Sequence, residues 1–470
     1  MRYRRAHFIG IGGVGMSATA LILRDAGVAV SGSDEAVYPP MSTLLSREGL
    51  SWQPYDPVNI PLDADLIVIG KNAKLVPETN AEVAAAYASG IPTRSFPEVL
   101  AELSHELGKT PVVVAGSYGK STSTALLAHC LIELGADPSY VIGAVPLTPA
   151  RSAHLGQGDL LILEGDEYPS SNTDPRSKFL HLDPAHLLLT PVTHDHVNVF
   201  PTPASYLAPF RELLSMIPEA GTIVACTEGD LSAEILAGCG RTIVTYGLAE
   251  GDYRAADIAW GETTTFAIMR GGKRLGTFST TLLGAHNIQN IVGVAAFLLE
   301  QRLGDERAIG NAIASFRGLV RRLDRKSEKT RIPIFEGFGS SYEKARSAID
   351  AMRQHFPEKR LLVVFEPHTF SWRNRDAIGW YDDVFAGAAK AFIYEPATQG
   401  AQTHQQLAQE EIVARVAASG MDAAAIHDAT ALPAVMDAVR DGDAILLLSS
   451  GPLAGLPETL PRALEEAFPA

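Results

Sequence analysis

Short apolar runs alternate along this chain with longer segments in which apolar residues recur every three or four positions. The runs at 6–12 (AHFIGIG) and 64–70 (ADLIVIG) end in glycine and have the length of buried strands. The segment from Met16 to Asp25 has helical spacing instead. Strand and helix patterns that alternate in this way predict an α/β fold built on parallel sheets.

The alternation falls into three blocks, and we predict one domain for each, at residues 1–108, 109–318 and 319–470. Each block contains several strand patterns with helix patterns between them, which is typical of a complete α/β sheet. A charged stretch from Arg321 to Arg331 follows the second boundary and predicts an exposed connection. The sequence therefore predicts three α/β domains in series.

Individual strands are clearest in the second and third blocks. In the second block, strands are predicted at 112–115, 159–167, 186–196, 222–230 and 242–247. In the third block, strands are predicted at 332–339, 360–367, 389–396 and 443–451. The segment 263–282 predicts a hairpin that turns at Gly271-Gly272, and a helix follows from near His286.

The composition excludes several classes of protein. The chain has 39 Lys and Arg against 54 Asp and Glu, and the net charge of -15 argues against a nucleic-acid binder. No apolar run reaches the length that a membrane span requires. Cys130, Cys226 and Cys239 lack C-x-x-C spacing, which argues for a reducing compartment and against structural zinc. Because the first glycines follow a strand and open a helix, we predict a folded N-terminus and a cytoplasmic protein.

A glycine-rich loop, GIGGVGM, joins the first strand to the first helix. Its glycines Gly12, Gly13 and Gly15 would let backbone N–H groups approach a pyrophosphate at the positive end of the helix. Asp34 lies 22 residues beyond Gly12, where dinucleotide-binding folds place a ribose-binding carboxylate. The loop predicts a nucleotide diphosphate site, and a tight turn without a ligand is the alternative.

A second glycine loop, VVVAGSYGKSTSTALL, is close to a phosphate-binding loop but shorter. The usual spacing has four residues between the glycines, whereas Gly116 and Gly119 are separated by two. Lys120 would reach the β- and γ-phosphates, and Ser121 would bind Mg²⁺. The strand before the loop favours this interpretation over a chance match.

Acidic residues and histidines follow two later strands of the same block. Glu164, Asp166 and Glu167 end the strand at 159–167, where a phosphate-bound magnesium needs an oxygen ligand. In THDHVNVF, we predict that His194 and His196 share one face of a strand end. We interpret His194 as a structural residue and His196 as facing a magnesium-phosphate site across from Glu164. Zinc is disfavoured because no third ligand cluster is apparent.

Five motifs in order, GSYGKST, EGDEY, DHVNVF, GAHNIQN and GLVRRLD, resemble the Mur ligases, a family of ATP-dependent amide ligases of peptidoglycan assembly. The resemblance covers nearly the whole chain, and the short phosphate loop is the form this family uses. It implies a Rossmann-like first domain that binds a UDP-sugar, a central ATP-binding domain with the phosphate loop, and a Rossmann-like third domain that binds the amine substrate. It also implies a role in cell-wall biogenesis and cell shape.

The resemblance implies that ATP and Mg²⁺ bind to the central domain. The loop residues implied to hold the triphosphate are Gly116, Gly119, Lys120, Ser121 and Thr122. The residues implied on the adenine side are His286, Asn287 and Asn290. The residues implied in catalysis are Lys120, Glu164, His196 and Arg322. Ser121, Glu164 and His196 would bind metal, and Arg322 would neutralise the γ-phosphate.

The resemblance also implies two substrates. Gly12, Gly13, Gly15 and Asp34 would hold the UDP portion of a UDP-N-acetylmuramate-like acid. An amino acid or a peptide would supply the amine, and His368 and Arg373, in the stretch FEPHTFSWR, are implied as substrate contacts. Neither a nucleic acid nor a membrane is an expected partner.

Different stretches resemble different branches of the family. VYPPMSTLL (37–45) and RSKFLH (176–181) are most similar to the murein peptide ligases, which join UDP-N-acetylmuramate to a recycled tripeptide. The pair Pro367-His368 is more similar to the L-alanine-adding branch, as is the first glycine loop. The peptide-adding branch is the closer resemblance by these stretches.

The chain departs from the family pattern in several places. The third domain usually carries two acids, an aromatic residue, a small residue and two histidines, but this chain has EGFGSSY at 336–342. The acids are replaced by Glu336 and Gly337, and an asparagine pair is replaced by Thr190-Pro191. In related ligases an aspartate at the position of Gly337 binds the ATP ribose, so we expect weak ATP binding that Gly337→Asp would tighten.

The expected activity is ligation through an acyl phosphate. The muramyl carboxylate would attack the γ-phosphate of ATP, and an amine would then displace phosphate. The alternatives are a relative that binds UDP-sugar or ATP without ligating anything, and a nicotinamide dehydrogenase built on the first domain. The dehydrogenase is disfavoured because it leaves the second glycine loop without a role.

Overall fold

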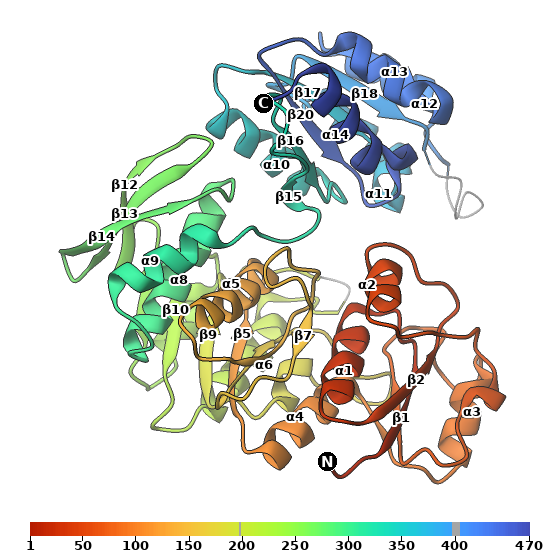
Figure 1. Ribbon diagram of the computed structural model, residues 1–470, viewed down its shortest axis with the longest axis vertical. Helices are drawn as coiled ribbons and strands as arrows, with labels where there is room; N and C mark the ends of the chain where they lie inside the picture. The colour runs from red at the N-terminus through yellow and green to blue at the C-terminus, as the bar shows by residue number, and fades with distance from the viewer. Residues whose placement is uncertain (197–198, 397–404) are drawn as a thin grey trace. The chain divides into compact units, whose positions relative to one another are not determined.

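The computed structural model describes residues 1–196, 199–396 and 405–470 (Figure 1). The chain forms two compact units. The first unit contains Met1–Ile258, Thr265–Thr280 and His286–Gly318. The second unit contains Ala259–Thr264, Thr281–Ala285 and Leu319–Ala470. The second unit therefore includes two short segments that come from the ends of the hairpin in the central block.

The first unit opens with a four-stranded sheet of order β2-β1-β3-β4, in which all pairs are parallel. Its elements are β1 (Arg5–Ile9), α1 (Val14–Asp25), β2 (Ala29–Ser33), α2 (Met41–Arg47), η1 (Pro57–Asn59), β3 (Leu66–Ile69), α3 (Ala81–Ala88), β4 (Thr93–Arg94) and α4 (Phe96–Leu107). All four residues of β3 are buried, as expected for a strand covered on both faces. The parallel α/β prediction is confirmed.

Helix α4 shows how local sequence sets the ends of an element. Ser95 and Glu98 form a capping box at its N-terminus, and Pro97 occupies the first turn, where a missing N–H costs nothing. Gly108 ends the helix in the left-handed conformation with φ +61°. Two residues later the chain enters β5 (Thr110–Ala115), the strand that leads into the short phosphate loop.

The second sheet of the first unit has ten strands, in the order β14-β13-β12-β11-β10-β9-β5-β8-β6-β7. Its other elements are α5 (Lys120–Glu133), β6 (Ser139–Val141), β7 (Ala153–His154), β8 (Leu160–Glu164), η2 (Lys178–His181), β9 (His186–Leu189), α6 (Pro203–Met216), β10 (Ile223–Cys226), α7 (Ser232–Ala237), β11 (Val244–Gly247), β12 (Tyr253–Ala259), β13 (Thr264–Arg270), β14 (Lys273–Thr280), α8 (Ala285–Glu300) and α9 (Glu306–Ser315). Strands β8 and β9 run parallel to β5 on either side of it. The carboxyl ends of these three strands therefore meet at one edge, where α/β sheets bind ligands.

The predicted hairpin is confirmed. Strands β13 and β14 are joined by Gly271 and Gly272, whose φ values of +52° and +84° suit a tight hairpin turn.

The two sheets of the first unit also pack together. Arg151, which follows β6, pairs with Asp25 of α1 at 3.0 Å, and the Ser95 and Ser170 hydroxyls are 2.7 Å apart. The predicted boundary at residue 108 thus separates two sheets of one compact unit.

The second unit has a six-stranded sheet of order β15-β16-β20-β17-β18-β19. Its elements are β15 (Arg322–Arg325), β16 (Ile334–Gly337), α10 (Tyr342–His355), β17 (Arg360–Phe365), α11 (Phe370–Arg373), η3 (Arg375–Asp382), β18 (Lys390–Tyr394), α12 (Gln409–Ala418), β19 (Asp422–Ile426), α13 (Asp428–Ala438), β20 (Asp443–Leu448), η4 (Leu453–Gly455) and α14 (Leu456–Ala467). All strands are parallel except β15. The core on one face of the sheet contains residues of α10 and α12, and that on the other contains residues of α13 and α14. The alanine-rich β19 was not predicted, because alanine is depleted in strands.

The prediction of an exposed connection from Arg321 to Arg331 is wrong. Part of this stretch is β15, which pairs with β16 and buries Asp324. The charges are tolerated because they satisfy one another. Lys326 Nζ lies 2.8 Å from Glu336 Oε2 and 3.3 Å from Asp324 Oδ2, and Arg321 Nε lies 3.0 Å from Glu336 Oε1. Burial raises the pKa of Asp324 to about 6, although Lys326 opposes the shift.

His355, at the end of α10, binds both hairpin segments of the second unit. Its ring is buried, Nε2 accepts a hydrogen bond from the Gly284 N–H at 2.8 Å, and Nδ1 lies 2.8 Å from the Gly261 carbonyl. Because one nitrogen accepts from a backbone N–H, the neutral imidazole with its proton on Nδ1 satisfies both contacts. Burial lowers the pKa of His355 accordingly. The ring of Trp260 packs edge-on against it.

Candidate active site

The short loop after β5 is held in a conformation that requires its glycines. Gly116 has φ +137° and Gly119 has φ +84°, both in the region that side chains disfavour. A Cβ at Gly116 would clash with Thr190, and a Cβ at Gly119 would clash with the Asn290 side chain. The loop therefore fits only glycine at both positions. Lys120, Ser121 and Thr122 follow in the first turn of α5.

The segment after β9 supports this short loop. The Ser117 N–H donates to the Pro191 carbonyl at 2.8 Å, and the Ser117 hydroxyl accepts from the Thr193 N–H at 2.8 Å. The same hydroxyl lies 2.7 Å from the Tyr206 hydroxyl. Thr190-Pro191, which replaces the expected asparagine pair, thus supplies backbone contacts to the loop. Sequence reasoning missed Ser117, because its partners are 76 and 89 residues away.

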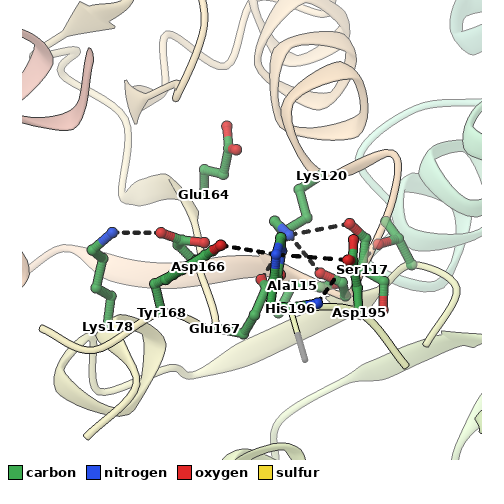
Figure 2. A network of polar contacts seen from close by, with 12 residues as sticks. Ala115, Ser117, Lys120, Glu164, Asp166, Glu167, Tyr168, Lys178, Asp195 and His196 are labelled. Carbon is green, nitrogen blue, oxygen red and sulfur yellow. Dashed lines mark hydrogen bonds and ion pairs between the residues drawn. The ribbon is translucent and has the colours of Figure 1, made fainter. Parts of the chain in front are cut away.

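Lys120 is bound to Glu167, which the sequence analysis named only as one of three acids at a possible magnesium site. Its Nζ lies 2.7 Å from Glu167 Oε2 and donates to the Gly116 carbonyl at 2.7 Å. Glu167 is fully buried. Figure 2 shows Lys120, Glu167 and His196 converging, with Glu164 to one side. Glu167 is the last residue of the EGDE motif, and its place in this motif is the sequence feature that could have indicated its contact with Lys120.

Ser121 and Glu164 form a second pair. The Ser121 hydroxyl donates to Glu164 Oε1 at 2.8 Å, and the Gly143 N–H donates to Oε2 at 2.7 Å. Burial raises the pKa of Glu164, while Ser121 and Lys120 lower it. A Cβ at Gly143 would lie 2.7 Å from the Glu164 carboxyl group, so the approach of this backbone needs glycine. A hydroxyl and a carboxylate this close are the hard oxygen donors that Mg²⁺ prefers, so the pair fits the predicted metal.

The predicted position of His196 is wrong. It was expected opposite Glu164 on a strand end, but its backbone has φ +57°, and Nε2 lies 3.1 Å from Glu167 Oε1. The Tyr168 hydroxyl lies 2.8 Å from Nδ1. The hydrogen bond with Glu167 raises the pKa of His196, and burial opposes the shift. Strand β9 ends before the motif because Pro191 follows it, so the expected alternation of faces does not apply.

The three predicted metal ligands are consequently not gathered in this conformation. Within residues 1–196, 199–396 and 405–470, no group of three His, Cys, Asp or Glu side chains is placed to hold a metal ion. His194 is structural, as expected, since its Nε2 lies 2.8 Å from the Phe200 carbonyl. Asp166 pairs with Lys178 at 2.5 Å, and this lysine keeps the pKa of Asp166 low although burial opposes it.

The residues predicted on the adenine side lie at the start of α8. Asn287 and Asn290 are buried and lie 3.3 Å apart through Nδ2 of Asn290 and Oδ1 of Asn287. The Asn290 side chain faces Gly119, so this residue forms part of the wall of the loop. His286 is exposed. The structure therefore places Asn290 against the short glycine loop, and Asn287 accepts a hydrogen bond from Asn290.

In the first glycine loop, a backbone N–H group is hydrogen-bonded to the carboxylate of Asp34. The Gly12 N–H donates to Asp34 Oδ2 at 2.8 Å, and the Tyr55 hydroxyl donates to Oδ1 at 3.3 Å. Gly13 is the N-cap of α1. A Cβ at Gly15 would lie 2.8 Å from the ring of Phe96, so this glycine serves the packing of α1 against α4. The position of Gly15 thus has a packing reason that is independent of any nucleotide.

The other predicted residues belong to the second unit. Arg322 is exposed on β15, between Arg321 and Leu323, whose φ values are +62° and +57°. His368 follows β17 and lies 3.1 Å from Glu366. Arg373 is buried in α11, and burial lowers its pKa. The burial of Arg373 argues against the direct substrate contact that was expected of it.

The structure changes what we expect of Gly337. A Cβ at this position would lie 3.1 Å from the Leu448 side chain and 3.4 Å from that of Leu323, so an aspartate would enter apolar surroundings. An unpaired buried polar group costs about 1–3 kcal/mol and a charged one more. We therefore expect Gly337→Asp to lower the melting temperature by several degrees without tightening ATP binding. Differential scanning fluorimetry measures the melting temperature, and ATP titration measures the affinity, of Gly337→Asp and of the control Gly337→Ala. Tighter ATP binding by Gly337→Asp with an unchanged melting temperature would contradict this expectation.

Across the three described ranges, we find no helix with the length and apolar character needed to cross a membrane.

Known proteins match this arrangement along the whole chain. Residues 5–106 match the Mur ligase family, catalytic domain, and residues 114–298 match the Mur ligase middle domain. A UDP-N-acetylmuramate–L-alanine ligase of Geobacter sulfurreducens is 32% identical over 471 residues, covering 99% of each chain. A ligase of the same name from Roseiflexus is 34% identical over 400 residues, covering 80% of this chain and 81% of the relative.

Solved structures agree on the fold. The UDP-N-acetylmuramate–alanine ligase of Thermotoga maritima has a TM-score of 0.80 at 21% identity, covering 99% of this chain and 100% of its own. A murein peptide ligase from Psychrobacter arcticus has a TM-score of 0.66 at 24% identity with the same coverage. Given the family matches and the full-length relative, this chain belongs to the Mur ligase family of ATP-dependent ligases.

Proposed function

We propose that this enzyme joins the carboxylate of UDP-N-acetylmuramate to the amine of an amino acid or a short peptide, with ATP as the energy source, in peptidoglycan synthesis or recycling. The proposal rests on the side chains at the sheet edge where the carboxyl ends of β5, β8 and β9 meet. There the short loop places Lys120 beside Glu167 and Ser121 beside Glu164. A cation and a pair of oxygen donors thus lie where a triphosphate would meet the helix N-terminus.

The chemistry requires an electrophile stronger than a carboxylate. The acid oxygen attacks the γ-phosphate to give an acyl phosphate and ADP, and the amine then displaces phosphate. Lys120 offsets the negative charge on the transferring phosphate, and Arg322 is the second cation proposed for it. Ser121 and Glu164 would hold Mg²⁺, which would supply further positive charge for phosphoryl transfer when it is bound.

The first glycine loop is the proposed site for the UDP portion. In the structure, the Asp34 carboxylate accepts a hydrogen bond from the Gly12 N–H. A diphosphate would compete for that N–H, and the carboxylate released from it could then accept from a ribose hydroxyl. Gly12 and Asp34 therefore receive the main roles at this site, and Gly13 caps the helix that faces the diphosphate.

Two amines have separate support. L-Alanine is the amine named for the relatives in Geobacter and Roseiflexus. The tripeptide is supported by the stretches at 37–45 and 176–181, which resemble the murein peptide ligases. A murein peptide ligase of Neisseria is 30% identical with a TM-score of 0.60, over 68% of this chain and 99% of its own. Both candidates take the same acid, UDP-N-acetylmuramate.

The test is phosphate release from ATP and Mg²⁺ with UDP-N-acetylmuramate and each amine in turn. We expect release that requires the acid and one of the two amines, L-alanine or L-alanyl-γ-D-glutamyl-meso-diaminopimelate, with a product that contains both. Mass spectrometry identifies this product. Thermal stabilisation by UDP-N-acetylmuramate without phosphate release under any combination would contradict ligation and support a binding protein. Stabilisation by NAD alone would contradict the UDP-sugar site.

A further inference from the structure

A closed loop at residues 168–178 follows the EGDE motif and leads into η2. Its two sides are joined by backbone hydrogen bonds. The Ser170 N–H donates to the Arg176 carbonyl at 2.8 Å, and the Lys178 N–H donates to the Tyr168 carbonyl at 2.9 Å. These contacts close the base of the loop, so Lys178 returns to the residue that directly follows EGDE.

The 168–178 loop is anchored on the first sheet, at the carboxyl ends of β1 and β3. The Asn172 side chain donates to the carbonyls of Asn72 and Leu75, which follow β3, at 2.8 and 2.9 Å. The Leu75 side chain in turn packs against Gly10, the residue after β1. Ligands of open α/β sheets bind at this edge, and it is the edge proposed above for the UDP portion.

Lys178 extends between this edge and the EGDE motif. Its Nζ lies 2.5 Å from Asp166 Oδ2, and Figure 2 shows the two side chains pointing toward each other. The same Nζ lies 5.6 Å from the centre of the Phe96 ring, which packs against Gly15 of α1. Asp166 is two residues beyond Glu164, the proposed metal ligand. Lys178 therefore lies between the helix proposed to face the diphosphate and the proposed metal site.

The ammonium group of Lys178 has donors to spare. A lysine ammonium has three N–H donors, and Asp166 is its one hydrogen-bond partner among the described residues. The rings of Phe96 and Tyr168 lie 5.6 and 5.8 Å from Nζ and take the place of water beside it. Such a cation attracts an anion more strongly than a fully hydrated one, because the local dielectric is lower. The side chain is 17% exposed, so a ligand can reach it.

An anionic substrate needs a cation at this place. The end of β8 carries Glu164, Asp166 and Glu167, whose charges repel a further carboxylate. Lys120 is bound to Glu167 and is the cation proposed for the transferring phosphate. The acid has to extend from the first glycine loop to the second, because its carboxylate attacks the phosphate there. Lys178 is the cation on the side of the first loop.

We propose that Lys178 binds the lactyl carboxylate of UDP-N-acetylmuramate, and that this contact selects the acid over sugar nucleotides that lack a carboxylate. This inference rests on the proposed function, because it takes the UDP-sugar acid as the substrate. A carboxylate has two oxygens, so one accepts from Lys178 while the other stays free to attack the γ-phosphate. Asp166 is then the residue that holds the ammonium group in place.

The test compares the affinities for UDP-N-acetylmuramate and for UDP-N-acetylglucosamine, the same sugar nucleotide without the lactyl group. Titration calorimetry without ATP and Mg²⁺ measures both dissociation constants. A hydrogen bond to a charged group changes affinity by about ten- to a hundredfold, so the parent enzyme should prefer UDP-N-acetylmuramate by about that factor. Lys178→Met should remove the preference by weakening the binding of UDP-N-acetylmuramate alone, and Lys178→Arg should keep part of it.

The matched control is Arg176→Met. It removes an equal charge from the same loop, at an exposed pair with Glu212 of α6, and it should keep the preference of the parent enzyme.

Variants of Asp166 separate substrate binding from a purely structural role of the pair. Asp166→Asn removes the partner of Lys178 but keeps the ammonium charge, so this variant should still prefer UDP-N-acetylmuramate. The double variant Lys178→Met with Asp166→Asn leaves no unpaired charge of the pair, so it should fold and lose the preference. Comparison of the double variant with Asp166→Asn decides the question even where Lys178→Met does not fold.

Three results would overturn the assignment of Lys178. They are equal affinities of the parent enzyme for the two nucleotides, an unchanged preference in Lys178→Met or in the double variant, and an equal loss of both affinities in Lys178→Met and in Asp166→Asn. Phosphate release by the parent enzyme with ATP, Mg²⁺, UDP-N-acetylmuramate and each amine is measured alongside. Its absence would overturn the proposed function. Its presence with any of the three results would leave that function intact and reject only the role of Lys178.

Discussion

Replacing Lys120 by alanine is expected to lower ATP-dependent phosphate release by roughly a hundred- to a thousandfold, which is the usual loss when one donor to a developing charge is removed. Lys120 Nζ donates to the Gly116 carbonyl of the short glycine loop, and it is the cation that we propose for the transferring phosphate. The substitution removes the contacts of Lys120 with the Gly116 and Ser117 carbonyls, but it leaves the contacts of the Ser117 hydroxyl with Thr193 and Tyr206 in place. Glu167 loses one of its two partners and keeps His196, so the fold should survive with a lower melting temperature.

The measurement is a coupled phosphate-release assay at saturating acid and amine, with circular dichroism to check the fold. Lys273→Ala, on the exposed turn side of the hairpin, is the control that removes an equal charge far from the loop along the chain. It should retain the parent rate. Turnover of Lys120→Ala within a few fold of the parent would refute the assignment of this loop to ATP.

Replacing Glu167 by glutamine should reduce both stability and turnover. Its carboxylate is buried against Lys120 and His196, and removing one partner of a buried ion pair typically costs about 3–5 kcal/mol. The melting temperature should fall by several degrees, and turnover should fall because Lys120 and His196 lose the group that fixes both. Glu234→Gln is a matched control, because it breaks an exposed pair with Arg211, worth at most about 1 kcal/mol.

ATP should partly repair the glutamine variant. Its phosphates offer Lys120 a new anionic partner, so the thermal shift on adding ATP should be larger for Glu167→Gln than for the parent enzyme. Scanning fluorimetry with and without ATP measures this difference. An equal shift in both proteins, together with parent-like turnover, would show that Glu167 does not act on Lys120.

The sequence predicted the parts of the site that depend on local chemistry. Gly116 and Gly119 were identifiable because a strand precedes them and a Lys-Ser pair follows. Glu164 was identifiable because it ends an apolar run, and the parallel order of β8 beside β5 then brings it to Ser121. Apolar alternation likewise predicted the sheets, since buried parallel strands are almost continuously apolar.

Long-range contacts and backbone geometry escaped prediction. The pairing of His196 with Glu167 depends on a left-handed residue after β9, which no residue pattern marks. Strand β15 was missed because a strand with buried charges looks exposed in sequence, whereas Asp324 is buried against Lys326. Gly15 and Gly337 were interpreted through ligands, but their neighbours in space are Phe96 and Leu448. These neighbours lie far from the glycines along the chain, so only the folded structure shows them.

The contacts of His355 bear on how the polypeptide can be divided. Since Gly261 and Gly284 supply the partners of this buried ring, the second unit is not one continuous stretch of chain. A fragment that starts at Leu319 would leave both ring nitrogens without their backbone partners and would uncover the surface that Trp260 covers. During synthesis, by contrast, the hairpin ends leave the ribosome before α10, so their docking positions exist when that helix emerges. Genetic splitting or domain exchange at residue 318 would separate groups that fold as one body.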